Sequence, residues 1–485
     1  MSSSDQRYSR KQRSTGLSYR TKLSQGLGAI PDTIKNWVFN TFTLLFYNQI
    51  LGIDAVLVSI ALAVAIVIDA ISDPLVASYS DNLSTRWGRR HPLMLFSSLP
   101  LGAAMFGIFS PPDSLSPGGL LIWLLFFTIL VRSLMTLFFV PWAAIAAELS
   151  DDYDERTSLM SFRFGVGWIV GVSFPFVVFT YLMPGTEMQP VGQLNAKGYP
   201  IMASFAGILM TCGALLTTLL TVREIPFLRK HTAKQKSFRP SRTISDIKLS
   251  LENPHFSLVF VVVLLSSAIT GTIVSLNVYM WTYFWELTTA DLRWFPIAAI
   301  GAVGVLPLIG KLQKRWDKKE ILLTCSIVSL IEGLLIINSR FLGILPENGT
   351  TGLLVTLIGV GIFSAAIAVT QGVLVASVIA DILDEQELRT GLRQEAMFNA
   401  ALSFCGKAVS GIGLILGGLI INLIGLPAGI DPAEVPTETV KKLGVFAGVI
   451  LPLFYVIPIA LWRRYELTRK VHANIQRSLF LERQR

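Results

Sequence analysis

Long apolar stretches, separated by short polar or charged ones, run along most of the chain. A helix that crosses a bilayer needs about 20 mostly apolar residues, and the stretches allow twelve such crossings. The predicted spans are 27–51, 53–80, 91–109, 118–149, 157–183, 198–223, 255–286, 291–313, 319–342, 349–383, 393–425 and 438–463. The pattern therefore predicts an all-α membrane protein whose two ends lie on the same side of the bilayer.

The composition agrees with this reading, because 52% of the residues are apolar and only 15% are charged, against about 25% charged in soluble proteins. The three cysteines lie in apolar stretches, without the spacing of a disulfide framework or zinc site. No HExxH, GxSxG or P-loop motif occurs, so the sequence argues against a membrane enzyme. We expect no cofactor beyond a coupling ion, Na⁺ or H⁺.

The net charge of +9 is concentrated on one side of the predicted membrane. Most Lys and Arg lie in the N-terminal segment 1–26, the even-numbered loops and the C-terminal segment 464–485. The positive-inside rule then makes both termini cytoplasmic. This placement explains the charge without a nucleic-acid partner, and it predicts a multi-pass protein of the plasma membrane or bacterial inner membrane.

A long basic loop at 224–254 divides the spans into two sets of six, at 27–223 and 255–463. RWGRRHPLML at 86–95 aligns with RWDKKEILLT at 315–324, and AELSDDYDERT at 147–157 aligns with ADILDEQELRT at 380–390. Similar pairs in corresponding loops indicate a duplicated six-helix unit. Two parallel six-helix repeats predict the major facilitator fold, with a ligand near mid-membrane between the halves.

Three stretches carry a family resemblance: DAISDPLVASYSDNLSTRWGRRHP from 69, VPWAAIAAELSDDYDERTSLMSFR from 140, and ADILDEQELRTGLRQEAMFNAALSFCGKAVSG from 380. Together they resemble the glycoside-pentoside-hexuronide:cation symporter family of the major facilitator superfamily. The resemblance implies a monomeric secondary transporter that moves a sugar, glycoside or small polar solute with a cation by alternating access. The pattern is also similar to that of lysophospholipid carriers, so an amphipathic lipid substrate, or a transport-dead sensor, is the alternative.

Asp69 and Asp73 stand four residues apart in the second span, which puts both carboxylates on one helix face. Like charges so placed repel unless a proton or cation lies between them, and small hard cations prefer oxygen ligands. Alternatively, Asp69 pairs with Arg132 and Asp73 satisfies backbone left open by Pro74. The resemblance implies that both aspartates bind Na⁺ or H⁺, with Thr136 beside them.

Arg132 lies one turn before Thr136 in the fourth span. It either faces the aspartates as a built-in counter-ion, which favours proton coupling or uncoupled transport, or extends its side chain toward the cytoplasmic surface. Both readings stay open. In a melibiose-transporting member of the resembled family, an aspartate that recognises sugar precedes the Val-Pro step, and here that position is Phe139. Galactoside specificity therefore does not carry over.

The candidate substrate residues combine polar groups, which fix sugar hydroxyls, with an aromatic surface for the sugar ring. Asp32 of span one and Arg163 of span five supply the polar groups, and Arg163 matches a family arginine at the sugar site. Asp32 and Lys35 lie one turn apart, so they also have the spacing to neutralise each other. Trp142 is the predicted aromatic contact. Lys407 of span eleven meets an anionic substrate group or a span-two carboxylate.

Charges of both signs recur at the predicted cytoplasmic ends of the helices in each half. We expect salt bridges among them to close the cytoplasmic side and to separate when one half rocks against the other, although a solvated charge cluster is the alternative. The predicted gate residues are Asp81, Arg86, Arg89, Arg90, Glu148 and Arg156 in the first half, and Asp381, Asp384, Arg389 and Arg393 in the second.

Overall fold

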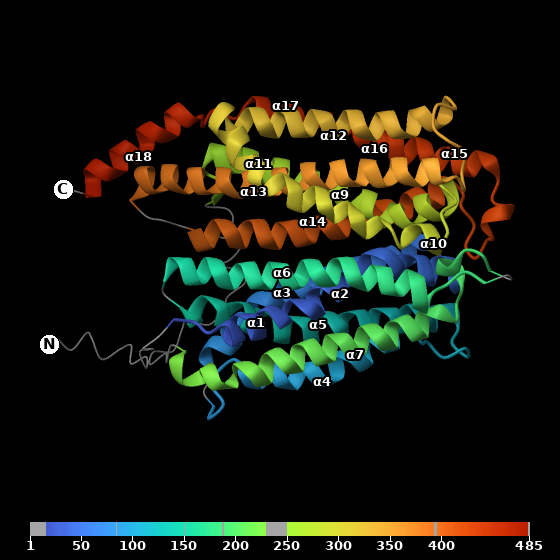
Figure 1. The fold of residues 1–485 in the computed structure, drawn as a ribbon, viewed down its shortest axis with the longest axis horizontal. Coiled ribbons are helices and arrows are strands. Elements are labelled where there is room, and N and C mark those ends of the chain that lie inside the picture. Colours follow the sequence, from blue (N-terminus) through green and yellow to red (C-terminus); the bar gives the residue numbers. More distant parts are fainter. Residues whose placement is uncertain are drawn as a thin grey trace. The chain divides into compact units, whose positions relative to one another are not determined.

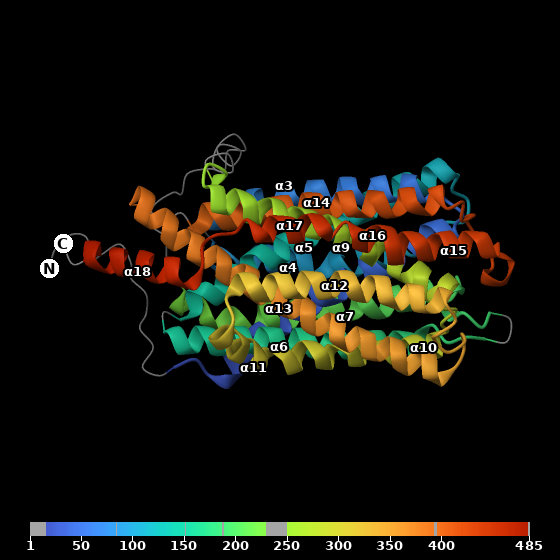
Figure 2. The same ribbon diagram turned by 90° about the horizontal axis from the view of Figure 1, so that it is seen from above.

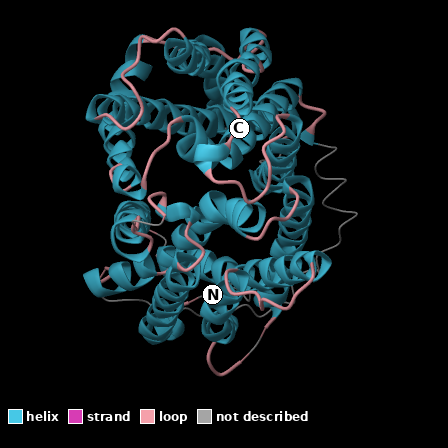
Figure 3. Ribbon diagram, turned by 90° about the vertical axis from the view of Figure 1, so that its right-hand side faces the viewer, coloured by secondary structure: helices cyan, strands magenta, loops and turns pink. Residues whose placement is uncertain are grey.

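The computed structural model describes residues 16–83, 85–150, 152–186, 189–228, 250–391 and 395–483, and every secondary-structure element in them is helical (Figure 3). The chain divides into two compact units, 1–238 and 239–485. The first unit contains α1 (Tyr19–Leu27), α2 (Ala29–Val38), η2 (Phe39–Thr43), η3 (Phe46–Ile50), α3 (Ala55–Asn82), α4 (His91–Ile108), α5 (Pro117–Leu149), α6 (Tyr153–Val177), η4 (Val178–Leu182), η5 (Gly192–Leu194), α7 (Gly198–Thr221) and η6 (Val222–Phe227).

Helix packing in the first unit brings α3 and α5 together, and α4 lies against both α5 and α7 (Figure 1). The α4–α7 contact is backbone to backbone, because a Cβ added at Gly102 would come 2.5 Å from the carbonyl oxygen of Gly207. Helices α1 and α2 pack against α6 and α7. The α3–α5 contact is the one that joins the second and fourth predicted spans, which carry the candidate cation-site residues.

The first predicted span is an interrupted helix with two π-helical turns, η2 and η3. A π-turn changes the direction in which the following side chains point. At the other end of this segment the Asn48 side chain donates to the carbonyl oxygen of Ile53 at 2.8 Å. Asp54 then caps α3 by accepting from the backbone amides of Val56 and Leu57. Asp32 and Asn36 precede the interruption, on α2, which packs next to α6.

The second unit contains α9 (Pro254–Tyr279), η7 (Met280–Phe284), α10 (Thr289–Leu292), η8 (Phe295–Ala298), α11 (Ala299–Arg315), α12 (Lys318–Phe341), α13 (Thr351–Thr390), α14 (Glu395–Leu423), η9 (Pro432–Glu434), α15 (Thr437–Val445), η10 (Phe446–Ile450), α16 (Leu451–Leu453), α17 (Val456–Arg463) and α18 (Arg469–Arg483). Helix α14 packs along α9, and α13 packs with both α11 and α12 (Figure 2). The 40-residue helix α13 ends at Gly391, which adopts the left-handed conformation with φ 68°.

Ten helices in the described part of the chain are long and apolar enough to cross a membrane. The interrupted segment from α1 to η3 and the helix α14 occupy the positions of the first and eleventh predicted spans. The C-terminal segment, expected to be a tail, holds the helix α18. Its Ile475 and Leu479, four residues apart, are buried in the core of the second unit, so the segment packs onto that unit.

Candidate functional site

A hydroxyl group lies between the two intramembrane carboxylates of the first unit. The Thr136 Oγ1 of α5 is 2.9 Å from Asp69 Oδ1 and 3.1 Å from Asp73 Oδ1, both on α3. Thr136 and Asp69 are buried. The Ser72 hydroxyl stands 3.4 Å from Thr136 Oγ1 and donates to the backbone oxygen of Asp69. The structure thus brings together the three residues predicted to form the cation site.

The geometry of these three residues can accommodate a proton or a cation. A hydroxyl has one hydrogen, so Thr136 can donate to only one of the two carboxylates at a time. The second short oxygen–oxygen contact is favourable when a proton on the carboxyl is donated to Thr136, or when a cation is bound by both oxygens. Oxygen ligands alone suit a small hard cation. The site is therefore chemically suited to H⁺ or Na⁺.

Arg132 lies beside this pair. Its Nη1 is 3.5 Å from Asp69 Oδ2, and its guanidinium carbon is 5.3 Å from the centre of the Phe39 ring. The side chain is largely buried, and its Nε meets no acceptor in the described part of the chain. Of the two readings left open by the sequence, the structure agrees with the counter-ion facing Asp69.

Asp32 is engaged within its own helix. Lys35 Nζ lies 3.1 Å from Asp32 Oδ1, and the Asn36 side-chain amide donates to Asp32 Oδ2 at 3.0 Å. The pairing with Lys35 is the one that the spacing allowed. Asn36 is exposed on the surface of the first unit, so the Asp32 carboxylate lies next to a polar group that a ligand can reach.

The structure corrects the expectation for Trp142. Its ring is 2% exposed, and the guanidinium carbon of Arg163 lies 3.6 Å from the ring centre. The indole N–H donates to the backbone oxygen of Gln25, and the Gln25 amide donates back to the Trp142 oxygen, at 2.9 and 2.8 Å. Gly28 packs so closely on the indole that a Cβ there would overlap it. Trp142 therefore supports Arg163 from behind and offers no open face to a sugar.

Phe139, at the position of the missing aspartate, is 36% exposed, and its ring centre lies 5.3 Å from that of Trp142. The remaining substrate candidate, Lys407, lies on α14 in the second unit and is partly buried. The contact of Lys407 with a substrate or with a span-two carboxylate stays a prediction.

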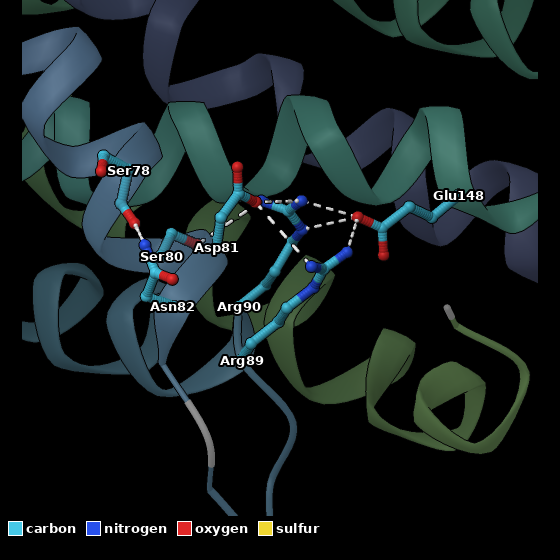
Figure 4. Close-up of polar contacts among 7 residues, drawn as sticks. All are labelled: Ser78, Ser80, Asp81, Asn82, Arg89, Arg90 and Glu148. Atoms are coloured by element: carbon cyan, nitrogen blue, oxygen red, sulfur yellow. Dashed lines mark hydrogen bonds and ion pairs between the residues drawn. The ribbon is translucent and has the colours of Figure 1, made fainter. Parts of the chain in front are cut away.

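Four of the six predicted gate residues of the first unit form a compact ionic network (Figure 4). Arg89 Nη2 and Arg90 Nη2 each lie 2.6 Å from Glu148 Oε1, and Arg90 Nη2 also lies 2.9 Å from Asp81 Oδ1. Glu148 is only 7% exposed. The network joins the end of α3, the start of α4 and the end of α5, so it ties three helices of one unit together.

Two expected gate residues of the first half lie apart from this network. Arg86 is exposed, and Arg156 donates from its Nε to the backbone oxygen of Ser150 at 2.7 Å. The ion pairs described above join residues of the first unit. A latch between the two halves therefore stays a prediction.

The second unit repeats one ion pair of the first. Lys318 Nζ lies 2.6 Å from Asp381 Oδ2. In the aligned repeats, Lys318 stands opposite Arg89, and Asp381 stands opposite Glu148. The internal repeat thus includes the ion pair, which is Arg89–Glu148 in the first unit and Lys318–Asp381 in the second. The alignment of RWGRR with RWDKK was the signal that could have added Lys318 to the predicted gate residues.

Helix α18 adds a partner to this second network, because His472 Nε2 lies 3.1 Å from Asp384 Oδ2 and 3.5 Å from Asp381 Oδ1. Burial and the neighbouring carboxylates raise the pKa of Tyr465, which lies just before α18. Arg389 is exposed, and Arg393 lies outside the described residues. His472 was not identified from the sequence because its segment was taken for a tail.

One acidic side chain inside a predicted span of the second unit was not identified from the sequence. The Ser364 hydroxyl of α13 donates to the Glu332 carboxyl of α12. The signal was available, since a carboxyl within the apolar stretch 319–342 is costly and needs a partner. Glu332 is a further intramembrane acid, separate from the aspartate pair.

Comparisons with known proteins agree with this architecture. Residues 24–469 match the family described as MFS/sugar transport protein. The chain is 26% identical to an uncharacterized symporter of Synechocystis sp., over 96% of this chain and 97% of that protein. It is 23% identical to the isoprimeverose transporter of Lactiplantibacillus pentosus, over 86% of this chain and 84% of that protein.

Among solved structures, the nucleoside transporter NupG has the same fold, with a TM-score of 0.60 at 12% identity, over 92% of this chain and 98% of that chain. The predicted all-α major facilitator fold and the predicted kinship are therefore confirmed. Since the family match extends over nearly the whole sequence, the chain belongs to the MFS/sugar transport family, whose members are integral membrane transporters and not enzymes.

Proposed function

We propose that the chain is a symporter that moves a sugar, glycoside or related small polar solute together with one monovalent cation by alternating access. The observation that carries the proposal is the Thr136 hydroxyl, which lies 2.9 and 3.1 Å from two intramembrane carboxylates. Relatives named as symporters and as an isoprimeverose transporter support the same class of function. Asp69, Asp73 and Thr136 are the proposed cation ligands.

One coupling ion per cycle is the simplest form of the proposal. A single H⁺ or Na⁺ can lie between the two carboxylates and the Thr136 hydroxyl. A proton binds one carboxyl oxygen and needs no shell of ligands, whereas Na⁺ needs several oxygens and is repelled by the neighbouring guanidinium. Arg132 therefore favours H⁺ over Na⁺ as the coupling ion.

The proposed substrate contacts of the first unit are Asp32 and Arg163, with Trp142 holding the guanidinium in place. Lys407 is the proposed contribution of the second unit. The gate residues would close the cytoplasmic side, and the concentration of basic residues there would set both termini in the cytoplasm. The protein would work as a monomer in the plasma membrane or bacterial inner membrane.

The test is uptake by proteoliposomes that contain the purified full chain. Labelled glycosides, uronides and lysophospholipids are offered under an inward pH gradient, an inward sodium gradient, or neither. We expect a sugar or glycoside to accumulate above its equilibrium level only when a cation gradient is present. Glu332→Gln, which changes an intramembrane carboxyl outside the cation site, is the matched control for carboxylate variants. Accumulation of lysophospholipid alone, or no accumulation of any solute, would refute the proposal.

A further inference from the structure

Glu332 is an acidic side chain in the interior of an apolar, membrane-spanning helix. It lies well inside α12, which begins at Lys318 and ends at Phe341. In the described part of the chain it forms no ion pair with a Lys or Arg, whereas Asp69 of the first unit has Arg132 at 3.5 Å. An ionised carboxylate in the hydrocarbon region is costly, so Glu332 needs a counter-ion or a proton.

The helices around α12 offer no counter-ion at the level of Glu332. Helix α12 packs against α11, α13, η10, α16 and α17, all of which lie within the described residues. The basic residues of these segments, and of α12 itself, lie close to helix ends: Lys311, Lys314, Arg315, Lys318, Lys319, Arg340, Arg389 and Arg463. The interior of this helix group is therefore without a basic side chain, and a proton is the remaining way to neutralise Glu332.

The packing beside Glu332 is close. A Cβ added at Gly333 would come 2.7 Å from the ring of Pro452 on α16, so the two helices touch next to the carboxyl. Tyr455, three residues after Pro452, is the titratable neighbour, and Glu332 acts on it electrostatically. The Tyr455 hydroxyl is engaged by Thr270 of α9. The polar contact that the structure gives to Glu332 is with Ser364 of α13.

The Ser364 hydroxyl has two acceptors and a single hydrogen. It contacts the Glu332 carboxyl, and it lies 3.0 Å from the backbone oxygen of Val360, four residues earlier on α13. If the hydrogen goes to Glu332, the contact with Val360 has none. If it goes to Val360, as is common for serine in a helix, the carboxyl must supply the hydrogen of the other bond. A protonated Glu332 satisfies both contacts, and an ionised one satisfies only one.

We propose that Glu332 is a resident proton site: it holds a proton at neutral pH, keeps it during the transport cycle, and uses it in the bond that joins α12 to α13. A transported proton needs a group to receive it, and the contacts of Glu332 in the described residues include no second carboxyl or histidine. The same two helices meet again where Gln371 Nε2 lies 3.4 Å from Ser326 Oγ. The inference adds a proton site outside the proposed cation site and does not depend on the transport function.

Infrared spectroscopy of the purified full chain in lipid vesicles tests the proton directly. A protonated carboxyl has a carbonyl band that an ionised carboxylate lacks, and a glutamate in water is ionised at neutral pH. We expect this band in wild type at neutral pH, and Glu332→Gln should lose the part that belongs to one carboxyl. Glu347→Gln, which changes an exposed glutamate of the same unit, should leave the band unchanged.

Two further variants make the assignment specific. Ser364→Ala keeps the carboxyl but removes its hydrogen-bond partner, so the Glu332 band should remain and move to higher frequency. Because the aspartate pair can also hold a proton, the comparison is repeated with Asp69→Asn and Asp73→Asn combined, where the Glu332 band should persist. A spectrum that does not change on Glu332→Gln, or a band that Ser364→Ala leaves in place, would overturn the inference.

Uphill transport tests whether the proton is resident. Glutamine is neutral and can donate to Ser364, so Glu332→Gln should still accumulate solute under an inward pH gradient. A variant that exchanges solute but no longer concentrates it would show that the Glu332 proton is transported, which would overturn its assignment as resident. Failure of wild type to accumulate any solute would contradict the proposed function and leave the infrared result untouched.

Discussion

Removal of the Arg132 charge should create a strong sodium site. Arg132 Nη1 lies 3.5 Å from Asp69 Oδ2. A sodium ion bound by Asp69, Asp73 and Thr136 at the oxygen distance of about 2.4 Å usual for hard cations would lie about 6 Å from the guanidinium. At an effective dielectric constant of about 20, two positive charges about 6 Å apart repel by about 3 kcal/mol. Arg132→Gln should therefore raise sodium affinity by about 100-fold.

Equilibrium binding of radioactive sodium to the purified protein measures this effect without any substrate. Arg132→Gln keeps an amide that can donate to Asp69, so the packing of α3 on α5 should be preserved. Arg132→Lys keeps the charge and should bind sodium as weakly as wild type, which separates the effect of charge from the effect of shape. The combined variant with Asp73→Asn should lose the gained sodium binding.

Tight sodium binding by wild type together with an unchanged affinity of Arg132→Gln would refute the predicted repulsion. That result would mean that the guanidinium does not act on the bound ion, despite its position beside Asp69. Titration at a second pH completes the test, because protons compete with sodium for the same carboxylates. Sodium affinity of the variant should fall as the pH is lowered.

Three further predictions concern the helix ends and the topology. Arg90→Ala removes one of two arginines from the buried Glu148. It should lower the thermal unfolding temperature, and it should slow transport more than it weakens substrate binding. A double-mutant cycle should give an interaction free energy of about 1–3 kcal/mol between Arg90 and Glu148. Tyr465→Phe should leave the unfolding temperature unchanged or raise it slightly, because the buried hydroxyl has no hydrogen-bond partner in the described part of the chain; a fall of several degrees would contradict this. A reporter inserted in 224–254 should read cytoplasmic and one in 185–197 external, and the reverse pattern would overturn the proposed orientation.

The repeating hydrophobic pattern and the two paired motifs were sufficient to predict the fold. Each span is a local property of about 20 consecutive residues, and the repeat is visible in the sequence itself. The spacing of Asp69 and Asp73 placed both on one face of one helix, which needs no tertiary information. Arg132 approaches one of these two aspartates, and which one depends on how α5 packs against α3. No sequence pattern specified that contact.

Trp142 illustrates why the substrate contacts were harder to predict. The predicted first span began at 27, so α1 was treated as part of a polar tail. In the structure, Gln25 of α1 binds the backbone and the indole N–H of Trp142, and this covers the ring. Helix α18 was missed for a similar reason. Two buried apolar residues, Ile475 and Leu479, are too few to suggest a membrane span, but they are enough to anchor the helix on the second unit. Both segments are amphipathic and pack on the protein.

The measurement that tests the central proposal most directly is uphill accumulation by proteoliposomes that contain either wild type or Asp73→Asn. Under an inward pH or sodium gradient, wild type should concentrate its solute above the external level. Asp73→Asn keeps the shape of the side chain but removes one charge from the pair around Thr136, so it should exchange solute across the membrane without concentrating it. Full uphill accumulation by Asp73→Asn would contradict the proposal that these aspartates couple ion binding to transport.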